Sequence, residues 1–190
     1  MNLVKADLSD EKQAMEVREK IIQKDGQLNH VVAAIGGWRT EGNLSTVPVE
    51  TYQQAITDMT LPHFVTYRTF SKMLSEKPNS TYTFVTGGSA AVKIFDPRAS
   101  ILPPSAGLMY GMYTSACSEY RTNKNLKLIQ LRVYFWVRRD PDYKFDPKKS
   151  QMEAGSDYVA KFLPKVILKN KTETYSLPTR ALADKLYTTL

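Results

Sequence analysis

Apolar residues recur along the chain in two alternating patterns. Mostly apolar runs at residues 28–35, 81–86, 126–137 and 172–177 are typical of buried strands, and residues 3–6 predict another short strand. Between these runs, apolar positions spaced three and four residues apart predict helices at 11–23, 51–74, 106–121, 158–168 and 179–187. Regular alternation of strands and helices predicts an α/β protein with a parallel sheet, built as one domain over residues 1–190.

Polar, glycine and proline residues mark the ends of these elements. The acidic segment 7–10 provides an N-cap for the first helix, and Gly26 is a stop signal at its other end. Three prolines make residues 93–104 a predicted loop, and a basic segment at 138–150 is a second one. Ser156 and Asp157 cap the helix that follows.

The composition is that of an ordinary globular protein. Hydrophobic residues make up 42% of the chain and charged residues 24%, which argues against wholesale disorder. Cys117 is the single cysteine, so an intrachain disulfide is excluded and a reducing compartment is favoured. No signal peptide and no apolar run long enough to span a membrane is visible, so we expect a cytoplasmic protein.

The net charge of +7 is placed unevenly. Residues 1–120 hold 11 basic and 12 acidic side chains, whereas residues 121–190 hold 15 basic and 7 acidic ones. Such a surplus favours anionic partners, but no nucleic-acid motif accompanies it, so we expect no nucleic-acid binding. The simpler interpretation is a solvated helix face, on which Lys161, Lys165 and Lys169 recur at a spacing of four.

Several segments, in chain order, resemble motifs of the short-chain dehydrogenase/reductase family. They are Ala-Asp-Leu-Ser-Asp at 6–10, Val-Ala-Ala-Ile-Gly-Gly at 32–37, Thr-Phe-Val-Thr-Gly-Gly-Ser at 83–89, Tyr110 within a helix, and Leu-Arg-Val at 131–133. The resemblance implies a Rossmann-like three-layer sandwich with a parallel sheet. It covers the family's third strand onward, so we expect a fold truncated at the N-terminus, without the glycine-rich βαβ unit that holds a pyrophosphate.

The resemblance also implies site residues. Tyr110 takes the position of the family's proton-exchanging tyrosine, and Ser89 that of the serine that holds the substrate oxygen. For NAD or NADP, the cofactor-binding positions would be Asp7 at the adenine ring, Ala33 and Gly36 in the turn after a strand, and Thr114 where the family has a lysine. The alternative register places Gly87, which has no hydroxyl, at the serine position.

The lysine position decides the functional prediction. A phenol, with a pKa of about 10, is a poor base at neutral pH without a nearby cation, and Thr114 cannot supply one. We therefore predict a catalytically impaired or non-catalytic relative of the family, a pseudoenzyme. Two alternatives stay open: a residual NAD(P)-dependent oxidoreductase acting on a small carbonyl or alcohol, and an anion-binding module that uses the basic C-terminal part.

Two further expectations concern partners and metals. The absent first strands would leave one side of the strand at 28–35 unpaired. Three outcomes stay open: residues 3–6 pair with that side, a second copy or another chain covers it, or the protein is poorly folded. His30 and His63 belong to no metal-ligand motif, so both are predicted to be structural and no metal is expected.

Overall fold

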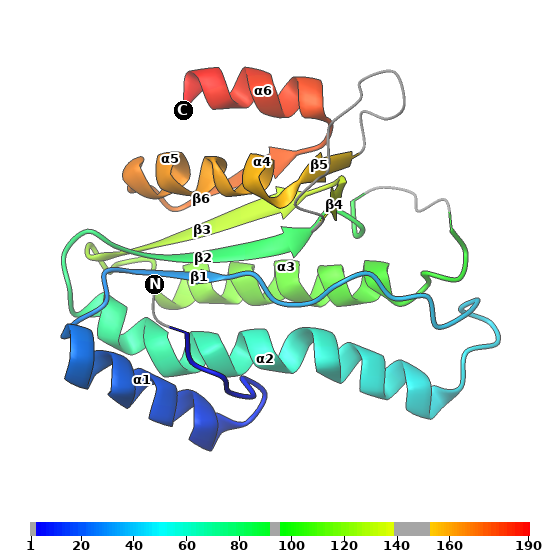
Figure 1. Cartoon of the computed structure of the whole chain (residues 1–190), viewed down its shortest axis with the longest axis horizontal. Coiled ribbons are helices and arrows are strands. Elements are labelled where there is room, and N and C mark those ends of the chain that lie inside the picture. The colour runs from blue at the N-terminus through cyan, green and yellow to red at the C-terminus, as the bar shows by residue number, and fades with distance from the viewer. Residues whose placement is uncertain (1–2, 92–95, 139–152) are drawn as a thin grey trace.

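The computed structural model describes residues 3–91, 96–138 and 153–190. Its central sheet has four parallel strands in the order β1-β2-β3-β6 (Figure 1). These are β1 His30–Ala33, β2 Ser80–Gly87, β3 Leu126–Val133 and β6 Glu173–Leu177. Because all four run parallel, their carboxyl ends meet at one edge, where open α/β sheets bind ligands.

Helices cover both faces of the sheet. Three of them, α1 Glu11–Asp25, α2 Val49–Ser75 and α3 Leu102–Glu119, lie on one face (Figure 1). The other face carries α4 Ser156–Ala160, α5 Phe162–Leu168 and α6 Arg180–Thr189. The predicted parallel-sheet, Rossmann-like three-layer α/β sandwich is therefore confirmed.

The ends of α1 follow from its sequence. The Asp10 carboxylate accepts hydrogen bonds from the backbone N–H groups of Lys12 and Gln13, as an N-cap should. Gly26 ends the helix with φ of 76°, a left-handed conformation that side chains with a Cβ rarely adopt. Both signals were predicted correctly.

Each face of the sheet has its own hydrophobic core. Tyr82, Phe84 and Leu128 point toward α2 and α3, where they meet Tyr67 and Tyr113. On the opposite face the strands pack against α4, α5 and α6 through a second group: Ile129, Leu131, Tyr158, Phe162 and Leu177. Because strand positions alternate between the two cores, apolar residues occur on both faces of β3.

The start of the chain departs from the prediction. Residues 3–6 form no strand, and Leu3 and Val4 are 85% and 48% exposed. A four-residue segment forms a strand only beside a partner edge, and it has none here. Among the described residues β1 pairs with β2 alone, so the outer side of β1 is unpaired, as expected.

The predicted strand 126–137 is also split. β3 ends at Val133, and Trp136–Arg138 form a separate strand, β4, that pairs in parallel with β5, Glu153–Gly155. Phe135, between the two strands, turns into the core and packs edge-on against Tyr158. The sequence pattern does not reveal this contact between Phe135 and α4.

Prolines shift two helix boundaries. The predicted loop at 93–104 is too long, because α3 already begins at Leu102. Pro103 and Pro104 occupy its first turn, where a missing N–H costs no hydrogen bond. The predicted helix 158–168 is interrupted at Lys161, since Pro164 removes a donor and its ring crowds the carbonyl four residues earlier. Most of the predicted loop at 138–150 lies outside the described residues.

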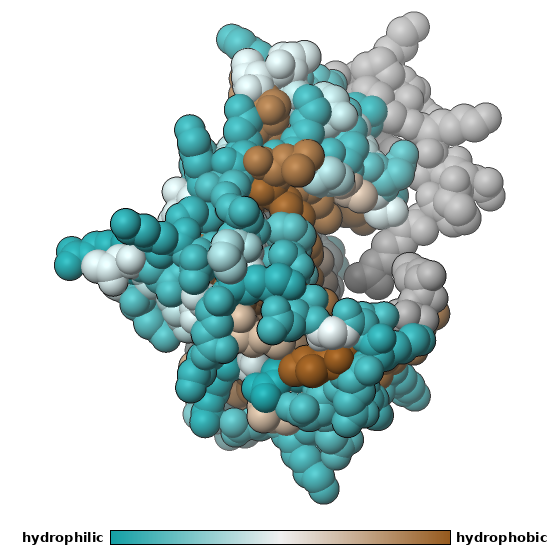
Figure 2. All heavy atoms as spheres, turned by 90° about the vertical axis from the view of Figure 1, so that its left-hand side faces the viewer, coloured by the Kyte–Doolittle hydropathy of each residue, from teal (hydrophilic) through white to brown (hydrophobic). Residues whose placement is uncertain are grey.

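No helix in the described part of the chain is both long enough and apolar enough to cross a membrane. The face shown in Figure 2 is mostly hydrophilic, with a brown patch in its upper part. Leu168, at the end of α5, is 81% exposed.

Candidate functional site

Tyr110 lies on α3 beside the carboxyl end of β2. Its hydroxyl donates a hydrogen bond of 2.9 Å to the backbone carbonyl of Gly87, the last residue of that strand. Helix α3 packs against β2 and β3, and this packing fixes the phenol at the carboxyl edge of the sheet, the edge at which open α/β sheets bind ligands. The role of Tyr110 in proton exchange stays a prediction.

A cation from the neighbouring strand covers the Tyr110 ring. The guanidinium carbon of Arg132 on β3 lies 3.8 Å from the ring centroid, well within cation–π distance. Arg132 is held in turn by the bond that its Nε donates to Gln130 Oε1, at 2.9 Å. In the sheet register Arg132 lies opposite Thr86, one residue before the carbonyl that Tyr110 contacts.

Tyr134 and Gly88 complete this cluster. A Cβ placed on Gly88 would lie 2.3 Å from Cγ of the Tyr134 ring, so that ring packs directly on the glycine backbone. Burial raises the pKa of Tyr110 to about 12, and the neighbouring Tyr134 phenol raises it too, while Arg132 acts in the opposite direction. The phenol of Tyr110 is thus a neutral donor at pH 7.

Thr114 does not provide what a lysine would provide. It lies one turn after Tyr110, and its hydroxyl donates a bond of 3.0 Å to the Tyr110 backbone carbonyl within the same helix. Nearby Cys117 is a free thiol whose pKa is raised by burial, so it is no activated nucleophile. The local chemistry on α3 is therefore neutral.

Ser89 is engaged elsewhere. Its hydroxyl donates to the carbonyl of Leu102, the first residue of α3, at 3.0 Å. Tyr110, by contrast, uses the Gly87 carbonyl. Among the described contacts no hydrogen bond joins the two hydroxyls, so the structure does not bring Ser89 and Tyr110 together as a pair.

The three remaining cofactor-binding candidates have different surroundings. Asp7 accepts bonds from both the backbone and the hydroxyl of Ser9, which lower the pKa of its carboxyl. Ala33 is buried in the core at the end of β1. Gly36 has a φ of 110° with open space around it, which is a reason for glycine in the turn that follows β1.

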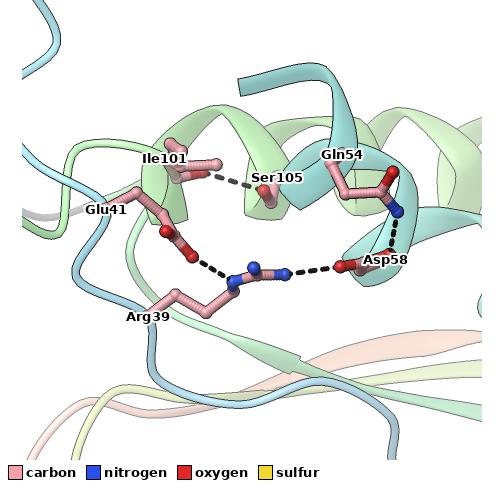
Figure 3. A network of polar contacts seen from close by, with 6 residues as sticks. All are labelled: Arg39, Glu41, Gln54, Asp58, Ile101 and Ser105. Atoms are coloured by element: carbon pink, nitrogen blue, oxygen red, sulfur yellow. Dashed lines mark hydrogen bonds and ion pairs between the residues drawn. The ribbon is translucent and has the colours of Figure 1, made fainter. Parts of the chain in front are cut away.

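The loop that follows β1 is tied to α2 (Figure 3) and to the segment before α3. Arg39 lies between two carboxylates, donating from Nε to Glu41 at 2.5 Å and from Nη1 to Asp58 on α2 at 2.8 Å. Gln54 donates to the other oxygen of Asp58 at 2.6 Å. Gly42 accepts a bond of 2.6 Å from the hydroxyl of Ser100, just before α3. These bonds fix the loop that begins with Gly36 and Gly37.

Both histidines have structural roles. Nε2 of His63 lies 3.0 Å from the Ile35 carbonyl, while its Nδ1 is buried with no partner among the described residues. Nδ1 of His30 lies 3.0 Å from the hydroxyl of Thr81. The described ranges contain no group of three or more His, Cys, Asp or Glu side chains that could hold a metal ion.

The lysines of the basic C-terminal part do not form a solvated outer face. Lys161 pairs with Asp184 at 3.3 Å, and Lys165 and Lys169 donate to the backbone carbonyls of Tyr187 and Thr189. All three cations therefore contact α6, and Lys165 and Lys169 satisfy carbonyls in its last turn, where the helix dipole favours positive charge. This corrects the interpretation drawn from their spacing.

The sequence pattern does not indicate Arg132 and Tyr134 as partners of Tyr110. The aromatic run 134–136 by itself predicts core packing, because its side chains fall on both faces of a strand. That assignment is right for Phe135, which is 4% exposed, and wrong for Trp136, which is 54% exposed. The available signal was the spacing of two between residues 132 and 134, which puts both side chains on one side of an extended chain.

Comparison with known proteins agrees with this architecture. No family model matches the chain. A curated sequence, the short-chain dehydrogenase/reductase iacG of Pestalotiopsis fici, is 28% identical over 164 residues, which cover 84% of this chain and 63% of that protein. The chain thus spans less than two thirds of the length of this relative.

Solved structures share the fold at low sequence identity. ElxO with bound NADPH superposes with a TM-score of 0.77 at 15% identity, over 93% of this chain and 76% of that one. A short-chain dehydrogenase/reductase of Serratia marcescens gives 0.75 at 12% identity, over 91% and 73% of the two chains. One from Mycobacterium ulcerans gives 0.74 at 12%, over 90% and 66%.

The sheet and its helical layers define a Rossmann-like α/β protein. The sequence match to iacG adds to the shared fold, and the predicted resemblance to the short-chain dehydrogenase/reductase family is confirmed.

Proposed function

We propose that this chain is a short-chain dehydrogenase/reductase-like protein in which Tyr110 does not exchange protons with a substrate at neutral pH. The observation that carries the proposal is the state of the phenol: half-buried, donating to the Gly87 carbonyl, with a pKa raised to about 12. At that pKa about one phenol in 100,000 is ionised at pH 7. The group is therefore a poor general base.

The residues around the phenol support the same proposal. The position one turn along α3 holds Thr114, whose hydroxyl is used by its own helix. In the first register the serine position is Ser89, whose hydroxyl donates to the Leu102 carbonyl. In the alternative register that position is Gly87, which has no hydroxyl. Thr114 provides no ammonium group where the family has a lysine, so the described residues do not fit the family's pattern for NAD or NADP.

A second candidate function is a residual NAD(P)-dependent oxidoreductase acting on a small carbonyl or alcohol. The observation that favours it is the Arg132 guanidinium, 3.8 Å from the Tyr110 ring centroid, a cation that reaches the phenol from β3 instead of α3. Arg132 counteracts the rise in the Tyr110 pKa. An ElxO variant of known structure, which shares the fold, holds bound NADPH.

The third candidate, an anion-binding module, has less support, because Lys161, Lys165 and Lys169 are already paired with α6. A cytoplasmic location and a homo-oligomer or partner chain along the free side of β1 stay predictions.

Two measurements test the proposal. NADH and NADPH are titrated while energy transfer from the tryptophans is recorded, and turnover of a panel of small carbonyls is compared between the wild type and Tyr110→Phe. We expect equal background rates in the two proteins. Turnover that Tyr110→Phe abolishes would overturn the proposal in favour of the residual enzyme.

Restoring the cation provides a complementary test. Thr114→Lys places an ammonium one turn from Tyr110, and Thr114→Gln is the neutral control of similar size. We expect the lysine variant alone to lower the pKa of Tyr110, measured as phenolate absorbance that disappears when Tyr110→Phe is added. Equal titration in both variants would mean that position 114 does not control the phenol.

A further inference from the structure

Two half-exposed tryptophans meet above the carboxyl edge of the sheet. Trp38 follows β1 and Trp136 begins β4, directly after β3, and they are 51% and 54% exposed. Their ring centroids lie 5.6 Å apart with the planes at 66°, an edge-to-face pair. Because β2 lies between β1 and β3, this contact crosses the end of β2.

Both tryptophans lie on anchored segments. The residue after Trp38 is Arg39, which is paired with Asp58 on α2 and with Glu41 (Figure 3). Trp136 is in register with Glu153 of β5, and Glu153 accepts a 2.7 Å bond from Arg138. The two indoles are therefore positioned by the fold and are not loose surface side chains.

The surroundings of the pair add further ring surface and positive charge. Tyr110 contacts the end of β2 that the tryptophan pair crosses, and it carries the Arg132 guanidinium on its ring. The guanidinium carbon of Arg138 lies 5.8 Å from the Trp136 ring centroid. Aromatic faces with nearby guanidinium groups recognise flat rings that carry a negative charge.

We infer that Trp38 and Trp136 form a binding site for a flat aromatic anion at the carboxyl end of β2. The ring of the ligand stacks against the two indoles and replaces part of the contact between them. Its negative charge lies on the side of the Arg132 and Arg138 guanidinium groups. This inference does not depend on whether Tyr110 transfers protons, because it concerns binding alone.

A matched pair of fluorinated probes tests the inference. The aromatic probe is 4-(trifluoromethyl)benzoate, and its saturated partner is trans-4-(trifluoromethyl)cyclohexanecarboxylate, which has the same charge and a similar size. Fluorine NMR line broadening is recorded as the protein is added. We expect the aromatic probe to broaden at protein concentrations that leave the saturated probe sharp.

Variants locate the site. Trp38→Ala and Trp136→Ala should each weaken binding of the aromatic probe by roughly 2- to 12-fold, the range expected from one aromatic contact. Phe64→Ala, at an aromatic side chain on α2 that is 47% exposed, is the control and should leave binding unchanged. Circular dichroism confirms that each variant is folded, and Trp38→Phe, which keeps a ring, should retain part of the affinity.

Three results would overturn the inference: no broadening of the aromatic probe, equal broadening of both probes, or broadening that survives both alanine variants. None of them bears on the turnover comparison between the wild type and Tyr110→Phe, so the two proposals fail separately.

Discussion

Substitution of Gly88 by alanine tests the packing at the candidate site most directly. The new Cβ would lie 2.3 Å from Cγ and 2.4 Å from Cδ1 of Tyr134, closer than non-bonded carbons approach. Cγ is near the base of the side chain, so the ring cannot avoid the methyl group by a small rotation. Overpacking of this kind costs about 1–3 kcal/mol of unfolding free energy.

The neighbouring Gly87 provides a matched control. An added Cβ there would have Ser89 Oγ as its nearest neighbour, at 3.8 Å, which is ordinary van der Waals contact. Gly87→Ala should therefore change stability by less than about 0.5 kcal/mol or raise it slightly, because alanine restricts the unfolded chain. The two variants differ by one position and should differ clearly in stability.

A double-mutant cycle identifies the cause. Urea unfolding is measured for the wild type, Gly88→Ala, Tyr134→Ala and the double variant. Without the Tyr134 ring, the alanine at residue 88 should cost almost nothing. If Gly88→Ala is equally destabilising in both backgrounds, the ring is not what excludes the methyl group and the reasoning fails.

Other predictions concern pH and charge. Burial lowers the pKa of His63 below its ordinary value of 6.5, so the unfolded chain binds the proton more readily and stability should fall as the pH drops below about 6.5. The urea midpoints measured at pH 5.5 and 7.5 should therefore differ less in His63→Gln than in the wild type. An unchanged difference would exclude His63 as the cause. Lys165→Met removes the 2.6 Å bond to the Tyr187 carbonyl and should lower the free energy of unfolding by about 0.5–1.5 kcal/mol in the same assay. Lys185→Met, at an exposed position of α6, is the control and should change it little. Equal effects of the two variants would contradict the role of Lys165. Asp58→Asn removes the ion pair with Arg39 that anchors the loop containing Trp38. Acrylamide should therefore quench tryptophan fluorescence more in this variant than in the control Glu50→Gln, near the start of α2. Identical quenching would show that the ion pair does not hold the loop.

The sequence by itself determined the fold class. Apolar runs of strand length that alternate with amphipathic segments predict a parallel sheet with helices on both faces. Local signals such as Asp10 and Gly26 set the ends of α1. The sequence also predicted that Tyr110 lies within a helix, and α3 confirms it. These are properties of neighbouring residues, so a linear pattern records them.

The tertiary structure decided the chemistry around the phenol. Arg132 contacts Tyr110 from β3, 22 positions further along the chain than this residue of α3. No periodicity in the sequence links a strand residue to one side chain of a helix. The turn of Phe135 into the core likewise separates β4 from β3 and exposes Trp136. Lys161, Lys165 and Lys169 share a helix face by spacing alone, but only the docking of α6 shows that this face is covered. Spacing along a chain fixes which side chains share a face, and packing alone fixes what that face meets.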